Sequence, residues 1–145
     1  MKTFQFGLSM CLSVLLPLEL SIAAPIPPST IAQAKMQGTA ESILKEAEIL
    51  VEQNTAASQQ QAIKKYLEAL LLVRALGDDL QSATLLNKIG KLYESLNDLQ
   101  PAVTYYNQAI SIYQDLGEFS QEAGVFQDLA MVYNSLGQWQ KITKL

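Results

Sequence analysis

The sequence contains no histidine, and its one cysteine, Cys11, lies in an N-terminal stretch that we expect to be removed. These absences exclude imidazole acid–base chemistry, a cysteine nucleophile, disulfides and zinc sites of the usual ligand sets. Basic residues are also scarce, because 10 Lys and Arg stand against 14 Asp and Glu, for a net charge of −4. A nucleic-acid or anionic membrane surface requires clustered positive charge. We therefore predict no catalytic activity, no cofactor, no metal and no nucleic-acid partner.

The first 23 residues have the pattern of a secretory signal peptide, with a lysine at the second position and an apolar stretch over Leu8–Leu18. Ser21 and Ala23 supply the small residues expected at a cleavage site after Ala23. We predict export to the periplasm or the cell exterior, with no stable membrane insertion after cleavage. The alternative is an uncut membrane anchor. It is disfavoured because spanning requires about 20 apolar residues and Glu19 interrupts this stretch.

A proline-rich segment follows the predicted signal. Pro25, Pro27 and Pro28 lie close together, and proline continues neither a helix nor a central strand. We therefore predict that residues 24–38 form an extended, mobile linker. Its role would be to space the folded domain, residues 39–145, from the cleavage site or the membrane.

The rest of the chain repeats with a helical period. Apolar residues recur at three- and four-residue spacing, as in Leu85, Ile89 and Leu92, and no segment alternates for long enough to form a strand. A shift of 40 residues superposes the chain on itself, and the matches are mostly small and aromatic. They include Ala62, Tyr66, Ala69 and Gly77, which coincide with Ala102, Tyr106, Ala109 and Gly117. A fixed period of this size is typical of a solenoid, so the predicted fold class is all-α.

Each period contains two predicted helices. They cover residues 40–53, 58–76, 79–96, 99–116, 120–136 and 138–145. Gly77 and Gly117 follow the last apolar residue of a helix and can adopt the positive φ of a helix C-terminus. Asp78, Asp79 and Asp98 can accept hydrogen bonds from the free N–H groups of the helices that follow. The short connections predict antiparallel hairpins over 40–76, 79–116 and 120–145, the last one truncated.

One copy of the repeated motif is Leu86-x-x-Ile89-Gly90-x-x-Tyr93-x-x-Leu96, followed by Ala102-x-x-x-Tyr106-x-x-Ala109. The next copy is Phe126-x-x-Leu129-Ala130-x-x-Tyr133-x-x-Leu136-Gly137. The motif resembles the tetratricopeptide repeat. Its 40-residue spacing is similar to the kinesin-light-chain type and to the arrays that precede bacterial caspase-like CHAT domains. The resemblance implies an antiparallel helix-hairpin solenoid, a superhelix of about two and a half repeats whose concave face binds a peptide.

The resemblance also implies which residues line that concave face. They are Thr84, Asn87, Lys91, Glu94, Ser95, Gln127, Met131, Asn134 and Ser135. Amide side chains there can hydrogen-bond a peptide backbone, and Lys91 can pair with a carboxylate. The alternative is an ordinary solvated helix face. Peptide-binding members often carry an asparagine two residues before the motif glycine, where this chain has Lys88 and Asp128.

Two polar clusters are better interpreted as ordinary helix surface than as sites. Ser42 and Lys45 match the spacing of a serine nucleophile and a lysine base, but the companion motifs of that chemistry are missing, which favours an ordinary helix start. Glu46, Glu48 and Glu52 form an acidic face without the loop geometry that gathers metal ligands.

Aromatic residues form another candidate site, a stacking surface for a sugar. Its members would be Tyr105, Tyr106, Tyr113 and Trp139. At helical spacing, such residues usually fill the core between repeats, which is the interpretation that we favour.

The predicted third hairpin is incomplete, because its second helix, residues 138–145, has only about two turns and is marginal by itself. Repeat arrays normally end in a polar cap. Either Phe126, Leu129 and Tyr133 are partly uncovered and recruit another chain, which would allow self-association, or the chain is the front of a longer array. The ending within a repeat favours the second alternative.

The predicted function is a non-catalytic scaffold for protein–protein interaction that binds a partner segment through the concave groove or the uncapped end. The competing hypothesis is a regulatory or sensor module at the N-terminus of a larger CHAT-type, caspase-like protease system. An enzyme in its own right is disfavoured by the missing histidine and cysteine.

Overall fold

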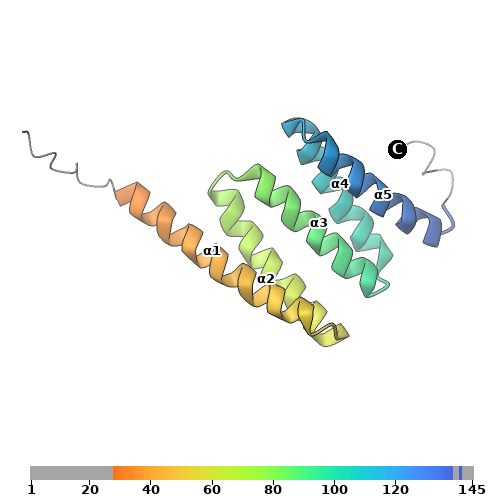
Figure 1. Ribbon diagram of the computed structural model, residues 1–145, viewed down its shortest axis with the longest axis horizontal. Coiled ribbons are helices and arrows are strands. Elements are labelled where there is room, and N and C mark those ends of the chain that lie inside the picture. Colours follow the sequence, from red (N-terminus) through yellow and green to blue (C-terminus); the bar gives the residue numbers. More distant parts are fainter. Residues whose placement is uncertain (1–27, 139–140, 142–145) are drawn as a thin grey trace, which may run out of the picture.

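The computed structural model describes residues 28–138 and residue 141. These residues form an all-α structure, as predicted. Its helices are α1 (Pro28–Glu52), α2 (Ala56–Ala75), α3 (Asp79–Ser95), α4 (Leu99–Leu116) and α5 (Phe119–Ser135). Helices α1 and α2 form one antiparallel hairpin, α3 and α4 form the next, and α5 follows beside them (Figure 1). None of these described helices has the length and apolar character required to span a membrane.

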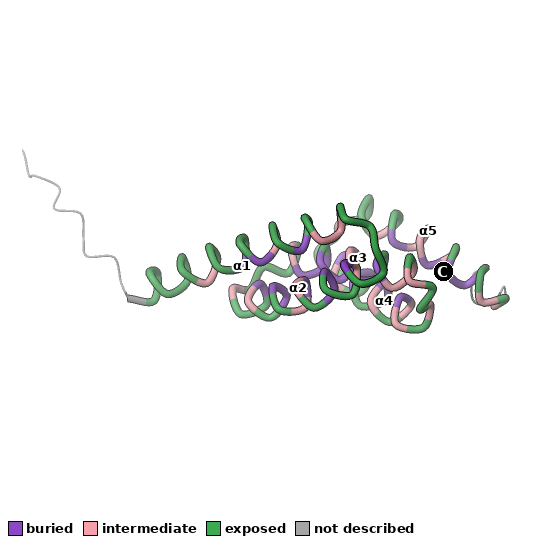
Figure 2. Tube along the Cα trace, turned by 90° about the horizontal axis from the view of Figure 1, so that it is seen from below, coloured by how far each residue is buried: buried purple, intermediate pink, exposed green. Residues whose placement is uncertain are grey.

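The helices lie in two layers, with α1, α3 and α5 in one layer and α2 and α4 in the other (Figures 1 and 2). Buried positions line the inner sides of both layers (Figure 2). Within each hairpin the two helices pack against each other, and α2 and α4 also pack against the first helix of the next hairpin. The hairpins therefore share one interior, which is the solenoid architecture expected from the period.

Residues 40 positions apart have the same role in this interior. Ala62 and Ala102 are fully buried, and so are Ala69 and Ala109. Their small side chains allow neighbouring helices to approach closely. Tyr66 and Tyr106 are also 40 residues apart. They fill the space between the helices of their own hairpins and are 3% and 0% exposed.

Gly90 is required by the packing between α3 and α4. A Cβ atom at this position would lie 2.7 Å from Cδ1 and Cε1 of the Tyr106 ring. Such a distance is shorter than real Cβ contacts, so any larger residue would push the buried tyrosine aside. The motif glycine is therefore explained by the tyrosine of its own hairpin.

The helix ends follow the predicted turn chemistry with two exceptions, Asp79 and Asp98. Asp79 was predicted to cap α3, but it is the first residue of that helix, and Asp78 is the N-cap. Gly77 and Gly117 have φ of +74° and +71°, and the backbone N–H of Gln81 donates to Asp78 Oδ1 at 2.9 Å. Asp98 occupies the equivalent position before α4 but makes no capping hydrogen bond with its side chain. The prediction for Asp98 was wrong because the residue three positions later is Pro101, which has no N–H to donate.

The predicted extended linker over residues 24–38 was also wrong from Pro28 onward, because α1 begins there. Proline is favourable in the first turn of a helix, where its missing N–H would have no partner in any case. The residues that follow Thr30, up to Gln37, include alanine, glutamine, lysine and methionine, which favour helix. The predicted signal peptide and residues 24–27 lie outside the described residues.

The other helix bounds lie close to the predicted ones. Helix α2 starts at Ala56 instead of residue 58, because Thr55 and Ser58 form a capping box: the N–H of Ser58 donates to Thr55 Oγ1, and the N–H of Thr55 donates to Ser58 Oγ. Of the predicted helix 138–145, only residues 138 and 141 lie within the described part of the chain.

Candidate functional site

A groove of about 520 Å³ opens between α1 and α3, above α2. We call it the α1–α3 groove. It is lined by Glu48, Val51 and Glu52 of α1, Gln59 and Tyr66 of α2, and Lys88, Lys91, Leu92 and Ser95 of α3. The stacking of the hairpins creates this space, because helices α1 and α3 lie in the same layer without close contact between their backbones.

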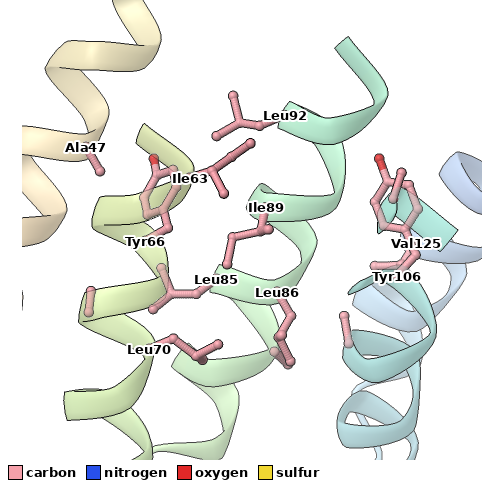
Figure 3. Close-up of a cluster of buried hydrophobic side chains, with 14 of the residues drawn as sticks. Ala47, Ile63, Tyr66, Leu70, Leu85, Leu86, Ile89, Leu92, Tyr106 and Val125 are labelled. Atoms are coloured by element: carbon pink, nitrogen blue, oxygen red, sulfur yellow. The ribbon is translucent and has the colours of Figure 1, made fainter. Parts of the chain in front are cut away.

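The floor of the groove is apolar. It consists of the Tyr66 ring, Leu92 and Val51, which are buried or half-buried. Tyr66 extends from α2 between α1, which carries Ala47, and α3, which carries Leu92 (Figure 3). The remaining lining residues are polar or charged. An apolar floor with a few polar groups around it is the usual composition of a binding site.

Ion pairs connect the three helices of this layer. Lys88 Nζ lies 3.1 Å from Glu48 Oε1 and 5.6 Å from the centre of the Tyr66 ring. Lys91 Nζ lies 3.1 Å from Asp128 Oδ2. Half-exposed pairs of this kind contribute at most about 1 kcal/mol each. They nevertheless hold the lysines in place, and they involve Lys88 and Asp128, the two residues that precede the motif glycine or its equivalent by two positions.

The tyrosines of the two hairpins differ in their hydroxyl groups. Tyr106 Oη donates a hydrogen bond of 2.6 Å to Glu94 Oε2. Burial raises the pKa of Tyr106 strongly, and this hydrogen bond raises it further. For Tyr66 the residue that corresponds to Glu94 is Asn54, whose Oδ1 accepts instead from Gln59 Nε2 at 3.1 Å. The Tyr66 side chain lines the groove.

Tyr66 is therefore a hydrogen-bond donor at the groove. Burial is the larger cause that raises its pKa, and the nearby negative charge of Glu48 adds to the effect. The hydroxyl consequently stays protonated well above neutral pH. It can donate to a carbonyl or carboxylate oxygen of a bound segment.

Of the predicted concave-face residues on α3, Lys91 and Ser95 line the groove. Glu94 instead accepts from Tyr106 in the interior of the second hairpin. Thr84 is exposed, and its Oγ1 donates to the carbonyl oxygen of Leu80 at 2.9 Å and lies 3.3 Å from Tyr113 Oη. Asn87 is half-buried, and its Oδ1 has no hydrogen-bond partner among the described residues.

The predicted residues on α5 lie away from the α1–α3 groove. Gln127, Asn134 and Ser135 are exposed, and Met131 is 49% exposed. They share the layer of α1, α3 and α5, but none of them lines this groove. Their role in partner binding stays a prediction.

None of the groove residues on α1 and α2 was predicted to line the concave face. They are Glu48, Val51, Glu52, Gln59 and Tyr66. The first copy of the motif lacks its glycine and its tyrosine, so no concave positions were assigned to α1. The 40-residue period could have indicated a groove position on α1, because Val51 lies 40 residues before Lys91, a predicted site residue.

The two polar clusters of α1 that were weighed as a nucleophile site and a metal site lie on the helix surface, and two of their glutamates form ion pairs. Ser42 and Lys45 are both exposed on the surface of α1. Glu46 Oε2 lies 2.6 Å from Lys65 Nζ, and Glu48 pairs with Lys88. Within the part of the chain that the structure describes, no three acidic, histidine or cysteine side chains are arranged to hold a metal ion.

The tyrosines of the candidate sugar surface mostly belong to the packing between helices. Tyr106 and Tyr113 are buried in the core. Tyr105 is half-buried and stacks on Tyr93, with 5.5 Å between ring centres and an interplanar angle of 8°. The interpretation as core is therefore confirmed for Tyr106 and Tyr113. Trp139 lies outside the described residues.

One prediction for the chain end was that the apolar face of α5 is partly exposed to water. Leu129 and Tyr133 are 0% and 8% exposed, which contradicts the less favoured alternative, that these residues are partly uncovered. They pack on the preceding hairpin, and Lys141 Nζ lies 5.4 Å from the centre of the Tyr133 ring. Phe126 is half-buried. The exposed aromatic residue is Phe119, at 76%, in the first turn of α5.

Comparison with known proteins identifies the type of repeat. Residues 55–115 match the family model of the tetratricopeptide repeat. Among solved structures, the chain is similar to the TPR domain of Arabidopsis FLU, with a TM-score of 0.67 and 19% sequence identity, over 75% of this chain and 89% of that one. No curated protein matches the chain significantly. The fold is thus a TPR helical solenoid.

Proposed function

We propose that this protein is a non-catalytic scaffold that binds a segment of another protein in the α1–α3 groove. The observation that carries the proposal is the groove itself, with its apolar floor of Val51, Tyr66 and Leu92 below polar side chains. Solenoids present extended surfaces between their stacked helices, and such surfaces bind partner segments. The family match and the structural likeness to a TPR domain support the same class of function.

The expected mechanism divides affinity and selectivity between the two parts of the groove. An apolar side chain that enters from the partner covers the floor, and burying it contributes on the order of 1.5–3 kcal/mol. The Tyr66 hydroxyl and the side chains of Gln59 and Ser95 then hydrogen-bond the partner backbone. The groove is formed by helix stacking, so little ordering of the scaffold opposes binding.

The test compares two tryptophan substitutions in the full chain. Ser95 is exposed and lines the groove, whereas Ser111 is exposed on α4 and is not among the lining residues. A displayed library of short random peptides is selected on the unchanged protein, and binding of the enriched peptides is measured by fluorescence anisotropy. We expect Ser95→Trp to abolish binding and Ser111→Trp to retain it, with equal helix content by circular dichroism. Equal binding by both variants would refute the proposal that the peptides bind in the α1–α3 groove.

We further propose that the protein is exported, on the strength of the signal-like pattern of residues 1–23. The scaffold would then act in the periplasm or outside the cell. Expression of the full chain in a secreting bacterium, followed by fractionation and N-terminal sequencing, tests this. A mature chain that begins at Ala24 in the extracytoplasmic fraction is the expected result. A chain that keeps Met1 in the cytoplasmic fraction would contradict it.

The alternative proposal is a regulatory module of a CHAT-type protease system, with repeats of the 40-residue kinesin-light-chain type. It is supported by the motif resemblance and the 40-residue period. A neighbouring reading frame that encodes a caspase-like domain would favour it. Partner binding by the chain expressed alone would favour the scaffold.

A further inference from the structure

We infer that the α1–α3 groove selects a partner segment in which a lysine or arginine lies next to an apolar side chain, and that Glu52 pairs with this cation. The inference rests on the proposed function and adds the chemical class of the partner. It follows from which of the charged groups around the groove are already paired.

Two glutamates and two lysines line the groove. Glu48 is paired with Lys88 across it, and Lys91 is paired with Asp128 of α5. Within the described residues, Glu52 makes no ion pair. It is exposed at the last residue of α1. The groove therefore offers one negative charge that a partner can pair with and no corresponding positive charge.

An acidic partner would meet a carboxylate at each lysine. Near Lys91 it would share the ammonium group with Asp128, and near Lys88 it would share it with Glu48. Two carboxylates on one cation repel each other, so the gain from such a contact is reduced. A basic partner pairs with Glu52 and leaves both existing ion pairs intact.

The surroundings of Glu52 suit the stem of a long basic side chain. Val51, the residue before it, and Leu92 both belong to the apolar floor of the groove. The methylene groups of a lysine or arginine can cover such apolar surface while the charge stays at the water-exposed carboxylate. An adjacent apolar side chain of the partner would lie against Val51, which is half-buried.

The positions of the later repeats that correspond to Glu52 carry no carboxylate. The residues 40 and 80 positions after Glu52 are Leu92 and Val132, which are 7% and 0% exposed and belong to the core. The selectivity for a basic side chain is therefore specific to the groove between α1 and α3, and is not a general property of the repeat.

The test uses three pools of short synthetic peptides that share a central leucine. The residue beside this leucine is lysine in one pool, glutamine in the second and glutamate in the third. Their affinities for the full chain are measured by fluorescence anisotropy. We expect the lysine pool to bind most tightly and the glutamate pool most weakly. The expected difference between the lysine and glutamine pools is up to about fivefold, the range of a half-exposed ion pair.

Substitutions of Glu52 assign the preference to one residue. Glu52→Gln is expected to reduce the affinity of the lysine pool to that of the glutamine pool, and Glu52→Lys to make the glutamate pool the tightest. The matched control is Glu68→Gln, because Glu68 is exposed on α2 and is not among the lining residues. Its order of affinities should equal that of the unchanged protein.

The outcomes separate this inference from the proposed function. If all pools bind equally, or if Glu52→Gln keeps the preference for lysine, the charge selectivity is refuted. Binding that is nevertheless abolished by Ser95→Trp would leave the proposed function standing. If no pool binds the unchanged protein more tightly than it binds Ser95→Trp, the proposed function itself fails.

Discussion

The first hairpin (α1 and α2) and the second hairpin (α3 and α4) have the same repeated backbone, but their tyrosines differ in hydrogen bonding. In the second hairpin, Tyr106 donates to Glu94, and Cα atoms of α3 and α5 approach within 8 Å. In the first hairpin, Tyr66 lines a groove. Among the described helices, no Cα atoms of α1 and α3 lie within 8 Å of each other. The same buried tyrosine is thus hydrogen-bonded in the interior of one hairpin and lines a groove in the other.

The two hairpins differ at the position whose side chain could accept from the tyrosine. Glu94 lies in the last turn of α3, where its carboxylate reaches Tyr106. Forty residues earlier the chain has Asn54, which lies beyond the end of α1 with a φ of +49°. A residue in this left-handed turn presents its side chain to Gln59 instead of the tyrosine. The tyrosine hydroxyl is therefore hydrogen-bonded within the second hairpin, whereas its counterpart in the first hairpin lines the groove.

The largest expected effect comes from Gly90→Ala in the second hairpin. The added Cβ would lie 2.7 Å from the Tyr106 ring, so the buried side chain must shift. We expect the free energy of unfolding to fall by about 1–3 kcal/mol, as measured by urea denaturation. The matched control is Gly124→Ala in α5, where the new Cβ meets no atom within 4 Å. There we expect unchanged or higher stability, because alanine favours helix. An equal loss in both variants would contradict the packing argument.

Removal of the tyrosine hydroxyls tests the contrast directly. Tyr106→Phe leaves the half-buried Glu94 carboxylate without its donor, and we expect a loss of about 1–2 kcal/mol in unfolding free energy. Tyr66→Phe should cost less than about 0.5 kcal/mol, because its hydroxyl lies at the groove. It should instead weaken binding of the selected peptides. Equal stability losses in both variants would show that the two hydroxyls have the same environment.

The starts of helices α3 and α4 offer a smaller contrast. Asp78→Ala removes the hydrogen bond from the Gln81 N–H and should cost about 1 kcal/mol in thermal or urea unfolding. Asp98→Ala should have almost no effect, since Pro101 offers no N–H to the side chain. If Asp98→Ala destabilises the protein as much as Asp78→Ala does, the explanation by proline is wrong.

The smallest expected effect is on the alkaline pH dependence of stability. Folding raises the pKa of Tyr66 and Tyr106 above the ordinary tyrosine value, mainly through burial. The neutral hydroxyls therefore stabilise the fold fully below a pH of about 10, and this contribution is lost as the pH rises further. We expect Tyr106→Phe to flatten the alkaline decrease in stability more than Tyr66→Phe does. Urea unfolding at several alkaline pH values measures both slopes, and identical slopes would contradict the expected order.

Much of the fold was predictable because its determinants are local. The glycines at 77 and 117 adopt positive φ, and the apolar spacing of each helix places its buried face. The start of α1 was mispredicted because proline interrupts a helix interior but also favours a helix start. The signal peptide and most of the predicted C-terminal helix lie outside the described residues, so these elements and the predicted export stay predictions.

The candidate site was less predictable. Lys91 and Ser95 were assigned from the motif, yet the groove takes most of its lining from α1 and α2. Glu94 has the spacing of a groove residue, but its carboxylate accepts from Tyr106. Which of two such roles a polar helix residue has depends on whether a partner from another helix reaches it, and residue spacing contains no such information.

The all-α class, the 40-residue period and most helix ends follow from local sequence patterns, because helix periodicity and capping act between residues a few positions apart. Three contacts do not follow from such patterns: Lys88 pairs with Glu48 across 40 residues, Tyr106 donates to Glu94, and Tyr66 faces a groove. These contacts depend on the distance and angle between stacked hairpins, which the packing of the whole interior sets.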